Sequence, residues 1–178
     1  MTPFQQIHIR KSASGWQLAA EGTHFACLIG RSGLVPADEK TEGDGATPVG
    51  SWPLRCLYYR PDRTDEDKIR QNSLLPCRPL SPQMGWVDDP ASVFYNRPVM
   101  LPSADRHETL WRKDGLYDLI IPLGYNDGPI QPGAGSAIFL HCADPHTTTT
   151  QGCVALAKQD LLSLLPRLDS RTVLTVHS

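Results

Sequence analysis

Apolar and polar positions alternate with a period of two over the first part of the chain, which is the pattern of half-buried β-strands. Residues 7–12 and 15–20 are two such segments, and residues 24–30 form a third after a turn at Glu21 and Gly22. Strands joined by such short turns pair with their neighbours in antiparallel order. We therefore expect the chain to begin with an antiparallel meander.

The alternation stops at residues 31–50, where turn-forming and charged residues predominate. It returns at residues 51–60, so we interpret the interruption as a long functional loop that leads into a strand. Residues 61–102 contain many prolines and few periodic segments. There we expect mostly irregular structure, with short strands around Trp86 and Tyr95.

The later part of the chain contains the two strongest strand candidates and one helix. Residues 116–125 and 136–142 are rich in β-branched and aromatic side chains, which favours central strands. Residues 157–165 predict a helix, because leucines recur there at three- and four-residue spacing. A last strand is expected at residues 172–177. The sequence thus predicts a single, mainly β domain over residues 1–178.

Composition narrows the functional classes. The chain has 17 Lys and Arg against 19 Asp and Glu, so its charge does not favour nucleic acid as a partner. No apolar run approaches the roughly 18 residues of a membrane span. The five cysteines are odd in number and form no CxxC pair, which favours reduced thiols. The first residues lack the pattern of a secretion signal, so we expect a cytoplasmic protein, or a periplasmic one if a signal peptide has been removed.

A histidine and a cysteine in the later part of the chain suit nucleophilic catalysis. His141 ends an apolar strand, and Gly152 and Cys153 follow a polar loop. A thiol attacks as thiolate, and a neighbouring imidazole lowers the thiol pKa by pairing with it. Gly152 lets the backbone approach a substrate carbonyl closely, so that N–H groups near Cys153 stabilise an oxyanion. Taken singly, each of these residues is more often structural than catalytic.

The segment Thr150–Cys153, which follows a strand histidine, resembles the signature of the L,D-transpeptidase catalytic domain family of the YkuD type. Residues 47–50 resemble the family's Thr-Pro-x-Gly element. The similarity covers most of residues 28–176 and includes three further blocks that resemble those of a bacterial subgroup: GWVDDP, YNRPV and LGYND.

The resemblance implies a β-sandwich of mixed sheets with one main helix after Cys153, and neither a metal nor an organic cofactor. It implies that Cys153 attacks the carbonyl of the L-centre in an L,D peptide bond of a peptidoglycan stem peptide, free or sugar-linked. His141 would accept the thiol proton and later serve the departing amine. Carbapenem-type β-lactams are then expected covalent inhibitors.

Two positions depart from the family pattern, so the substrate contacts made there must differ. Many members have His directly before Gly-Cys and Arg two residues after the cysteine, where this chain has Gln151 and Ala155. Other cations should therefore hold the stem carboxylates. A solvated or core position is the alternative for each candidate contact, and the candidates are Thr150, Gln151, Arg31, Lys40, Arg97, Trp86, Tyr125 and, less directly, Tyr95 and His146.

Two other classes of function compete with the enzyme. A zinc site is one, because four possible ligands lie within a short segment, namely His141, Cys142, His146 and Cys153. Adjacent strand residues point to opposite faces, however, so the first two of these would not grip one ion together. A catalytically dead peptidoglycan-binding module is the other class, and the presence of both thiol and imidazole argues against it.

Two enzymatic activities are compatible with this chemistry, and they differ in the molecule that accepts the acyl group from Cys153. Water gives an L,D-carboxypeptidase, which removes the terminal D-alanine after diaminopimelate, whereas an amine gives an L,D-transpeptidase that forms cross-links or exchanges the D-amino acid. A cytoplasmic enzyme would meet soluble wall fragments and abundant water. The sequence therefore favours carboxypeptidase action in peptidoglycan recycling, with transpeptidation as the alternative.

Overall fold

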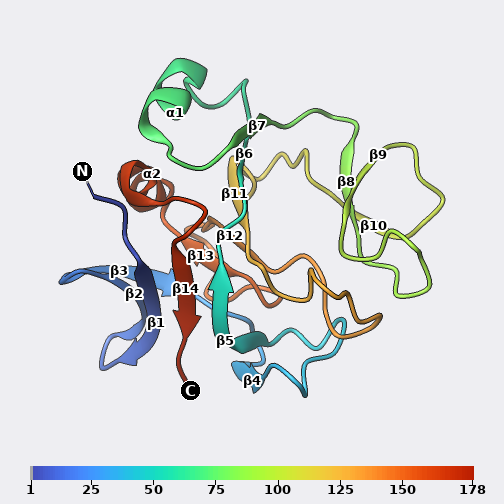
Figure 1. The fold of residues 1–178 in the computed structure, drawn as a ribbon, viewed down its shortest axis with the longest axis horizontal. Coiled ribbons are helices and arrows are strands. Elements are labelled where there is room, and N and C mark those ends of the chain that lie inside the picture. The colour runs from blue at the N-terminus through green and yellow to red at the C-terminus, as the bar shows by residue number, and fades with distance from the viewer. Residues whose placement is uncertain (1) are drawn as a thin grey trace.

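The computed structural model describes residues 2–178 and confirms a mainly β fold with mixed sheets and one main helix after Cys153. Eleven strands form one continuous, curved sheet in the order β4-β5-β14-β1-β2-β3-β13-β12-β11-β6-β7 (Figure 1). Strand β3 joins its two halves, because its first part pairs with β2 and its last two residues pair with β13. The sandwich is thus one sheet folded over at β3.

The first half begins with the predicted meander of β1 (Gln6–Ser12), β2 (Gly15–Ala20) and β3 (Thr23–Leu28). The chain end returns as β14 (Val173–Val176), which runs parallel to β1 and places both chain ends in this half. The outer edge of this half is formed by β5 and β4, at Thr47–Pro53 and Leu34–Pro36.

The second half carries the two strands predicted to be central. They are β11 (Leu119–Pro122) and β12 (Phe139–Cys142), paired antiparallel and both fully buried. Beside β12 runs β13 (Val154–Leu156) in parallel, and the outer strands are β6 and β7, at Leu57–Tyr59 and Cys77–Pro79.

The core lies between the two halves and is closed by α2 (Lys158–Leu164). Ile7 and Ile9 of β1 share one buried cluster with Ile121 of β11 and Leu140 of β12. The leucines on which the helix prediction rested all pack into this cluster, namely Leu161, Leu164, Leu165 and Leu168. A short 3-10 turn at Leu165–Arg167 follows α2, and Pro166 stands in it.

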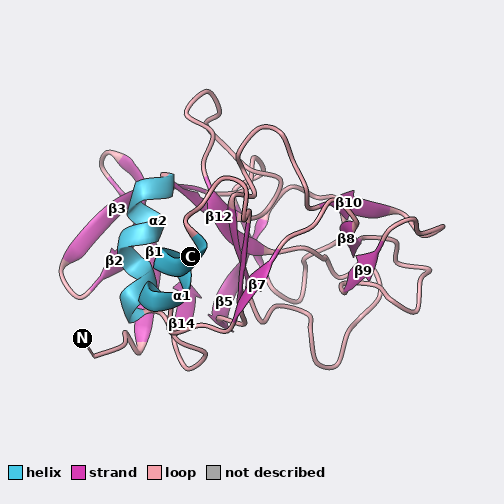
Figure 2. Ribbon diagram, turned by 90° about the horizontal axis from the view of Figure 1, so that it is seen from above, coloured by secondary structure: helices cyan, strands magenta, loops and turns pink. Residues whose placement is uncertain are grey.

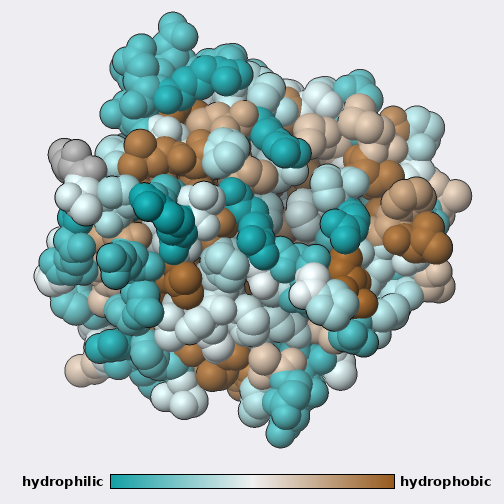
Figure 3. All heavy atoms as spheres, in the orientation of Figure 1, coloured by the Kyte–Doolittle hydropathy of each residue, from teal (hydrophilic) through white to brown (hydrophobic). Residues whose placement is uncertain are grey.

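A separate three-stranded sheet lies at the end of the molecule away from the helices and the chain ends (Figures 1 and 2). Its order is β10-β8-β9, at His107–Thr109, Met84–Val87 and Pro98–Met100. Figure 3 shows apolar surface at this end, where Val93, Phe94 and Met100 are exposed. No helix in residues 2–178 is long and apolar enough to cross a membrane.

Three predictions of local structure were wrong. Residues 31–50 are not one loop, because β4 lies inside them and β5 begins at Thr47. Tyr95 lies in a turn, since its backbone N–H bonds the carbonyl of Ser92 at 3.1 Å, and the next strand begins only at Pro98. A second helix, α1 (Glu66–Asn72), also exists and lies beside α2 (Figure 2).

Candidate active site

The pairing of β12 with β13 brings His141 and Cys153 to one face of the sheet. His141 is the register partner of Ala155, and Cys153 lies two residues before Ala155, so all three point to the same side. Cys142 points to the opposite side and belongs to the main core cluster. The adjacent His141 and Cys142 therefore do not share a ligand site, and no cluster of three metal-binding side chains occurs in the part of the chain that the structure describes.

The Cys153 thiol is buried between two backbone groups. It donates to the carbonyl of Ala137 at 3.1 Å and accepts from the N–H of Phe139 at 3.4 Å. Burial raises the pKa of this thiol to about 12, and the negative charge of Glu108 adds to the shift. Cys153 is therefore a neutral thiol, whereas the sequence suggested a thiolate of low pKa. The difference arises because desolvation outweighs the stabilisation of the anion.

His141 is neutral and its tautomer is fixed. Nδ1 lies 2.8 Å from the backbone carbonyl of Cys142, and because a carbonyl only accepts, Nδ1 must carry the proton. Nε2 is then the basic nitrogen. Burial lowers the pKa of the imidazole to about 4. The ring of Tyr117 packs edge-on against the imidazole, with centroids 5.3 Å apart, so the base has a fixed orientation.

Gly152 is required by the tight packing of the turn before the nucleophile. Its φ is +133°, and a Cβ there would lie 2.9 Å from the carbonyl oxygen of Ala46. Its N–H donates to Thr150 Oγ1 at 3.1 Å, and that hydroxyl donates to the carbonyl of Cys153 at 2.7 Å. Thr150 therefore stabilises the turn, and the N–H of Gly152 already has a partner in the resting site.

Thr47, from the Thr-Pro-x-Gly element, holds the same turn from the other side. Its hydroxyl donates to the carbonyl of Gly152 at 2.8 Å and accepts the N–H of Gly30 at 2.8 Å. The two sequence blocks that resemble the family signature thus meet in space, although about a hundred residues separate them along the chain.

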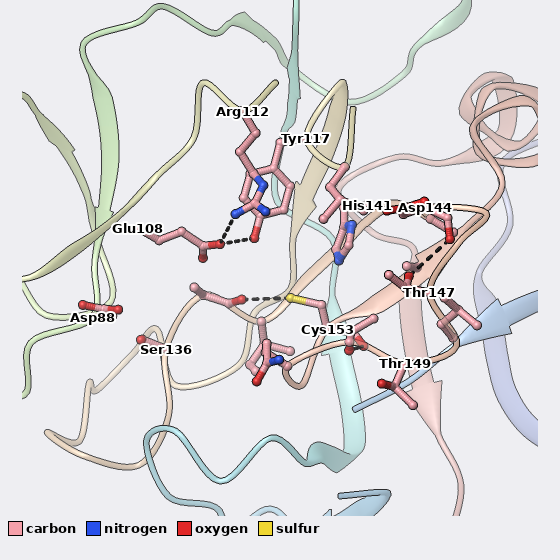
Figure 4. A pocket seen from close by; sticks show the side chains of 18 of the residues that line it. Asp88, Glu108, Arg112, Tyr117, Ser136, His141, Asp144, Thr147, Thr149 and Cys153 are labelled. Carbon is pink, nitrogen blue, oxygen red and sulfur yellow. Dashed lines mark hydrogen bonds and ion pairs between the residues drawn. The ribbon is translucent and has the colours of Figure 1, made fainter. Parts of the chain in front are cut away.

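A cavity of about 530 Å³ opens over Cys153 and His141 (Figure 4). Of the predicted contact residues, Thr150, Gln151 and Lys40 line it. Lys40 is buried, and its ammonium pairs with Asp44 at 2.7 Å. Arg31 lies at the rim, where it donates to the side chain of Gln151.

The structure does not bring the other candidates to this cavity. Trp86 and Arg97 line a second cavity, of about 230 Å³, and the Trp86 ring packs edge-on against Phe139. Tyr125 is buried against Trp52, and its hydroxyl donates to the carbonyl of Ala134 at 2.5 Å. His146 lies on the exposed loop after β12, outside the residues that line the catalytic cavity.

Sequence reasoning missed most of the polar wall opposite the thiol. Glu108 projects from β10, and Arg112 and Tyr117 follow in the loop that leads to β11 (Figure 4). Tyr95 does not line the cavity, but its hydroxyl donates to Glu42, which does. No periodic pattern marks these positions, because Arg112 and Tyr117 lie in a loop and Glu108 is placed by the pairing of β10 with β8.

A model of the L,D-transpeptidase catalytic domain matches residues 6–176. Two solved structures of L,D-transpeptidase 3 from Mycobacterium tuberculosis, one in complex with a faropenem-derived adduct, are 14% identical to this chain with a TM-score of 0.42. They align with 97% of this chain, which spans 60% and 61% of theirs. No curated protein matches.

Proposed function

Because the chain belongs to the L,D-transpeptidase catalytic domain family, we propose that it is an L,D-carboxypeptidase that removes the terminal D-alanine after diaminopimelate in peptidoglycan stem peptides. The observation that carries the proposal is the placing of Cys153 and His141 on one sheet face, with the basic nitrogen of His141 available as proton acceptor. A cavity of about 530 Å³ over them, lined by both polar and apolar residues, has room for several residues of a peptide.

In the first half-reaction the thiol proton moves from its contact with the Ala137 carbonyl to Nε2 of His141. The sulfur then attacks the carbonyl carbon of the L-centre, and a tetrahedral intermediate forms. Its collapse breaks the C–N bond, and the imidazolium returns the proton to the amine of the departing D-alanine. A thioester between Cys153 and the shortened stem remains.

In the second half-reaction water takes the place of the amine. His141 accepts a proton from water while its oxygen attacks the thioester carbonyl, and the thiol leaves with that proton. The products are a tripeptide and free D-alanine. Because His141 stays neutral at ordinary pH, it is ready to act as base in both halves.

The five cysteines support a cytoplasmic site of action. All of them are free thiols, and none forms a disulfide with another described residue. Reduced thiols are typical of the cytoplasm, where wall fragments are soluble and the acyl-enzyme meets water. The proposal therefore assigns the protein to the recycling of peptidoglycan fragments.

The test is mass spectrometry of purified protein with disaccharide tetrapeptide, with and without excess D-amino acid. We expect tripeptide without any added amine, and none from Cys153→Ala. The matched control is Cys77→Ala, which removes a half-buried thiol outside the catalytic cavity and should keep the activity. Product that appears only with the amine would make the protein a transpeptidase, and product from Cys153→Ala would reject the mechanism.

Carbapenem labelling tests the nucleophile apart from the acceptor. The strained amide of a carbapenem acylates an activated thiol, so one adduct mass per chain is expected on the wild type and on Cys77→Ala. Cys153→Ala should show no adduct. An adduct that persisted in this variant would assign the chemistry to another residue.

A further inference from the structure

Glu108, Arg112 and Tyr117 form a polar group on the cavity wall that faces the nucleophile (Figure 4). The hydroxyl of Tyr117 donates to Oε1 of Glu108 at 2.5 Å. Nη1 of Arg112 lies 3.7 Å from the same oxygen, and the guanidinium stands over the Tyr117 ring. A negative and a positive group are thus held side by side within the cavity.

Glu108 is less compensated than Glu42 and Asp88, two other carboxylates of the cavity. Glu42 accepts two hydroxyl donors, from Tyr95 and Ser136, and Asp88 pairs with Arg106 at 3.0 Å. Glu108 has one hydroxyl and one distant cation, and both approach the same oxygen. Burial raises its pKa despite these two contacts, so a further cation would stabilise its ionised form.

The hydrogen-bond donors of Arg112 are likewise only partly satisfied. Its Nε and Nη2 donate to Asp114, whereas Nη1 makes the loose contact with Glu108. A planar guanidinium with a free edge suits a second carboxylate. Lys40, the other cation of the cavity, is already paired with Asp44 at 2.7 Å and bonded to the carbonyl of Thr41 at 2.9 Å.

We propose that Glu108 and Arg112 form a subsite for an amino-acid zwitterion, in which Glu108 binds the ammonium and Arg112 the carboxylate at the end of the diaminopimelate side chain. This inference rests on the proposed function, because diaminopimelate would donate the acyl group. Its side chain ends in one carbon that bears both charges, so it needs an anion and a cation a few ångström apart. The separation of 3.7 Å meets that need.

The subsite is placed to act on the acyl donor. Glu108 and Cys153 line the same cavity, and Tyr117, whose hydroxyl donates to Glu108, packs its ring against His141 with centroids 5.3 Å apart. A substrate held at Glu108 and Arg112 by its side chain would present the carbonyl of its L-centre to the thiol. The two residues would thus select the donor and also orient it.

The experiment compares three tetrapeptides: the unmodified one, one acetylated on the side-chain amine, and one amidated on the side-chain carboxyl. The wild type should lose at least about tenfold in kcat/KM with each modification, since each removes a charge-assisted contact. Glu108→Gln should no longer distinguish amine from acetyl, yet still prefer acid to amide. Arg112→Gln should show the reverse pattern, and Glu66→Gln, on α1, should match the wild type.

A merely structural role would lower kcat/KM equally for all three peptides, and that result would overturn the inference. So would a wild type without preference among them. Because Arg112 also stands over Tyr117, Arg112→Gln removes a packing contact as well as a charge. Arg112→Lys keeps the positive charge, so it should retain part of the preference for the acid over the amide.

Calorimetry separates failure of the subsite from failure of the proposed function. Free tripeptide that ends in diaminopimelate is titrated into Cys153→Ala, with and without Glu108→Gln. Binding that weakens at least about tenfold with Glu108→Gln supports the subsite even if the wild type cleaves no tetrapeptide, and in that case only the proposed function fails. Cleavage together with equal binding by both proteins rejects the subsite and leaves the function standing.

Discussion

Cys153 and His141 carry pKa shifts of opposite direction that have one main cause, their burial beside each other in the sheet. Desolvation penalises the charged form of each, so the thiol pKa rises to about 12 and the imidazole pKa falls to about 4. The resting pair is neutral. Catalysis then requires bound substrate to favour transfer of the proton from the thiol to the imidazole. Desolvation of the charged forms also makes the free energy of unfolding depend on pH.

The pH dependence of unfolding tests this state of His141. Between its unfolded value of 6.5 and its folded value of about 4, the unfolded chain binds a proton that the folded chain does not. Stability should therefore fall as pH drops through this window, by roughly 3 kcal/mol from this residue alone. Urea unfolding of wild type and His141→Gln at about pH 7 and about pH 4.5 should give a smaller fall in the variant. Equal falls would contradict a buried neutral imidazole.

Gly152 has a backbone conformation that L side chains rarely adopt, and its surroundings leave no room for a Cβ atom. Gly152→Ala has to place a Cβ 2.9 Å from the Ala46 carbonyl at a φ of +133°. We expect a loss of about 2–4 kcal/mol in stability, and loss of activity because the turn that holds Cys153 shifts. Gly22→Ala is the matched control, since φ is +85° there but nothing lies within 4 Å. Thermal melts that shift equally for both variants would remove the steric argument.

At the scale of elements, Asn96 connects the small sheet to the catalytic strands. Its side-chain oxygen accepts from Trp86 Nε1 at 2.9 Å and from the N–H of Ala137 at 3.0 Å. Its amide nitrogen donates to the carbonyls of Tyr125 and Asn126, at 3.2 and 2.8 Å. Ala137 is the residue whose carbonyl receives the Cys153 thiol, so this one side chain helps to position the nucleophile.

Asn96→Asp replaces the side-chain NH2 group, which donates two hydrogen bonds, with an oxygen and leaves the accepting oxygen in place. A carboxylate oxygen would then face the two carbonyls of Tyr125 and Asn126, which is repulsive in a buried site. We expect a loss of about 2–3 kcal/mol in urea unfolding, together with slower carbapenem acylation of Cys153. The control Asn72→Asp alters an exposed amide at the end of α1 and should change neither quantity. Unchanged acylation in Asn96→Asp would disconnect the small sheet from the nucleophile.

The elements that the sequence could predict are those with a repeating pattern. The meander and the strands near His141 alternate or form apolar runs, and α2 has its leucine stripe. Helix α1 has only Ile69 buried, so no stripe marks it, although Asp65 at its N-cap and the acidic first turn were a usable signal.

In the small sheet only β8 was predicted, as the short strand around Trp86, and its two partners were missed for a different reason. Strands of three or four residues are too short to show a period, and side chains such as Asn96 hold the segment by contacts with residues distant in sequence. Glu108 and Arg112 thus reach the cavity by an arrangement that no local pattern encodes. His141 and Cys153 were predictable because they lie beside strongly patterned strands.

At the scale of the whole molecule, one sheet brings together segments from the entire chain. The turn before Cys153 is held by Thr47, which lies on β5, and β5 pairs with β14 at the chain end. The small sheet has no core of its own, because Trp86 and Leu110 bury themselves against Phe139 and Ile120 of the large sheet. We therefore expect residues 1–178 to unfold as a single unit.

Leu174→Ala tests whether the large and the small sheet unfold together, because Leu174 lies in the large sheet and far from the small sheet along the chain. Leu174 is fully buried on β14, between β5 and β1, so the truncation should cost about 2–5 kcal/mol. The measurement uses a Trp16→Phe, Trp52→Phe background, so that the fluorescence reports only Trp86 and Trp111 near the small sheet. If the molecule is one cooperative domain, backbone circular dichroism and this fluorescence should shift together to the same lower urea midpoint. Thr175→Ala, on the outer face of the same strand, should shift both far less. Fluorescence that kept its original midpoint while circular dichroism moved would mean that the small sheet folds independently, and that the wall carrying Glu108 is a separate domain.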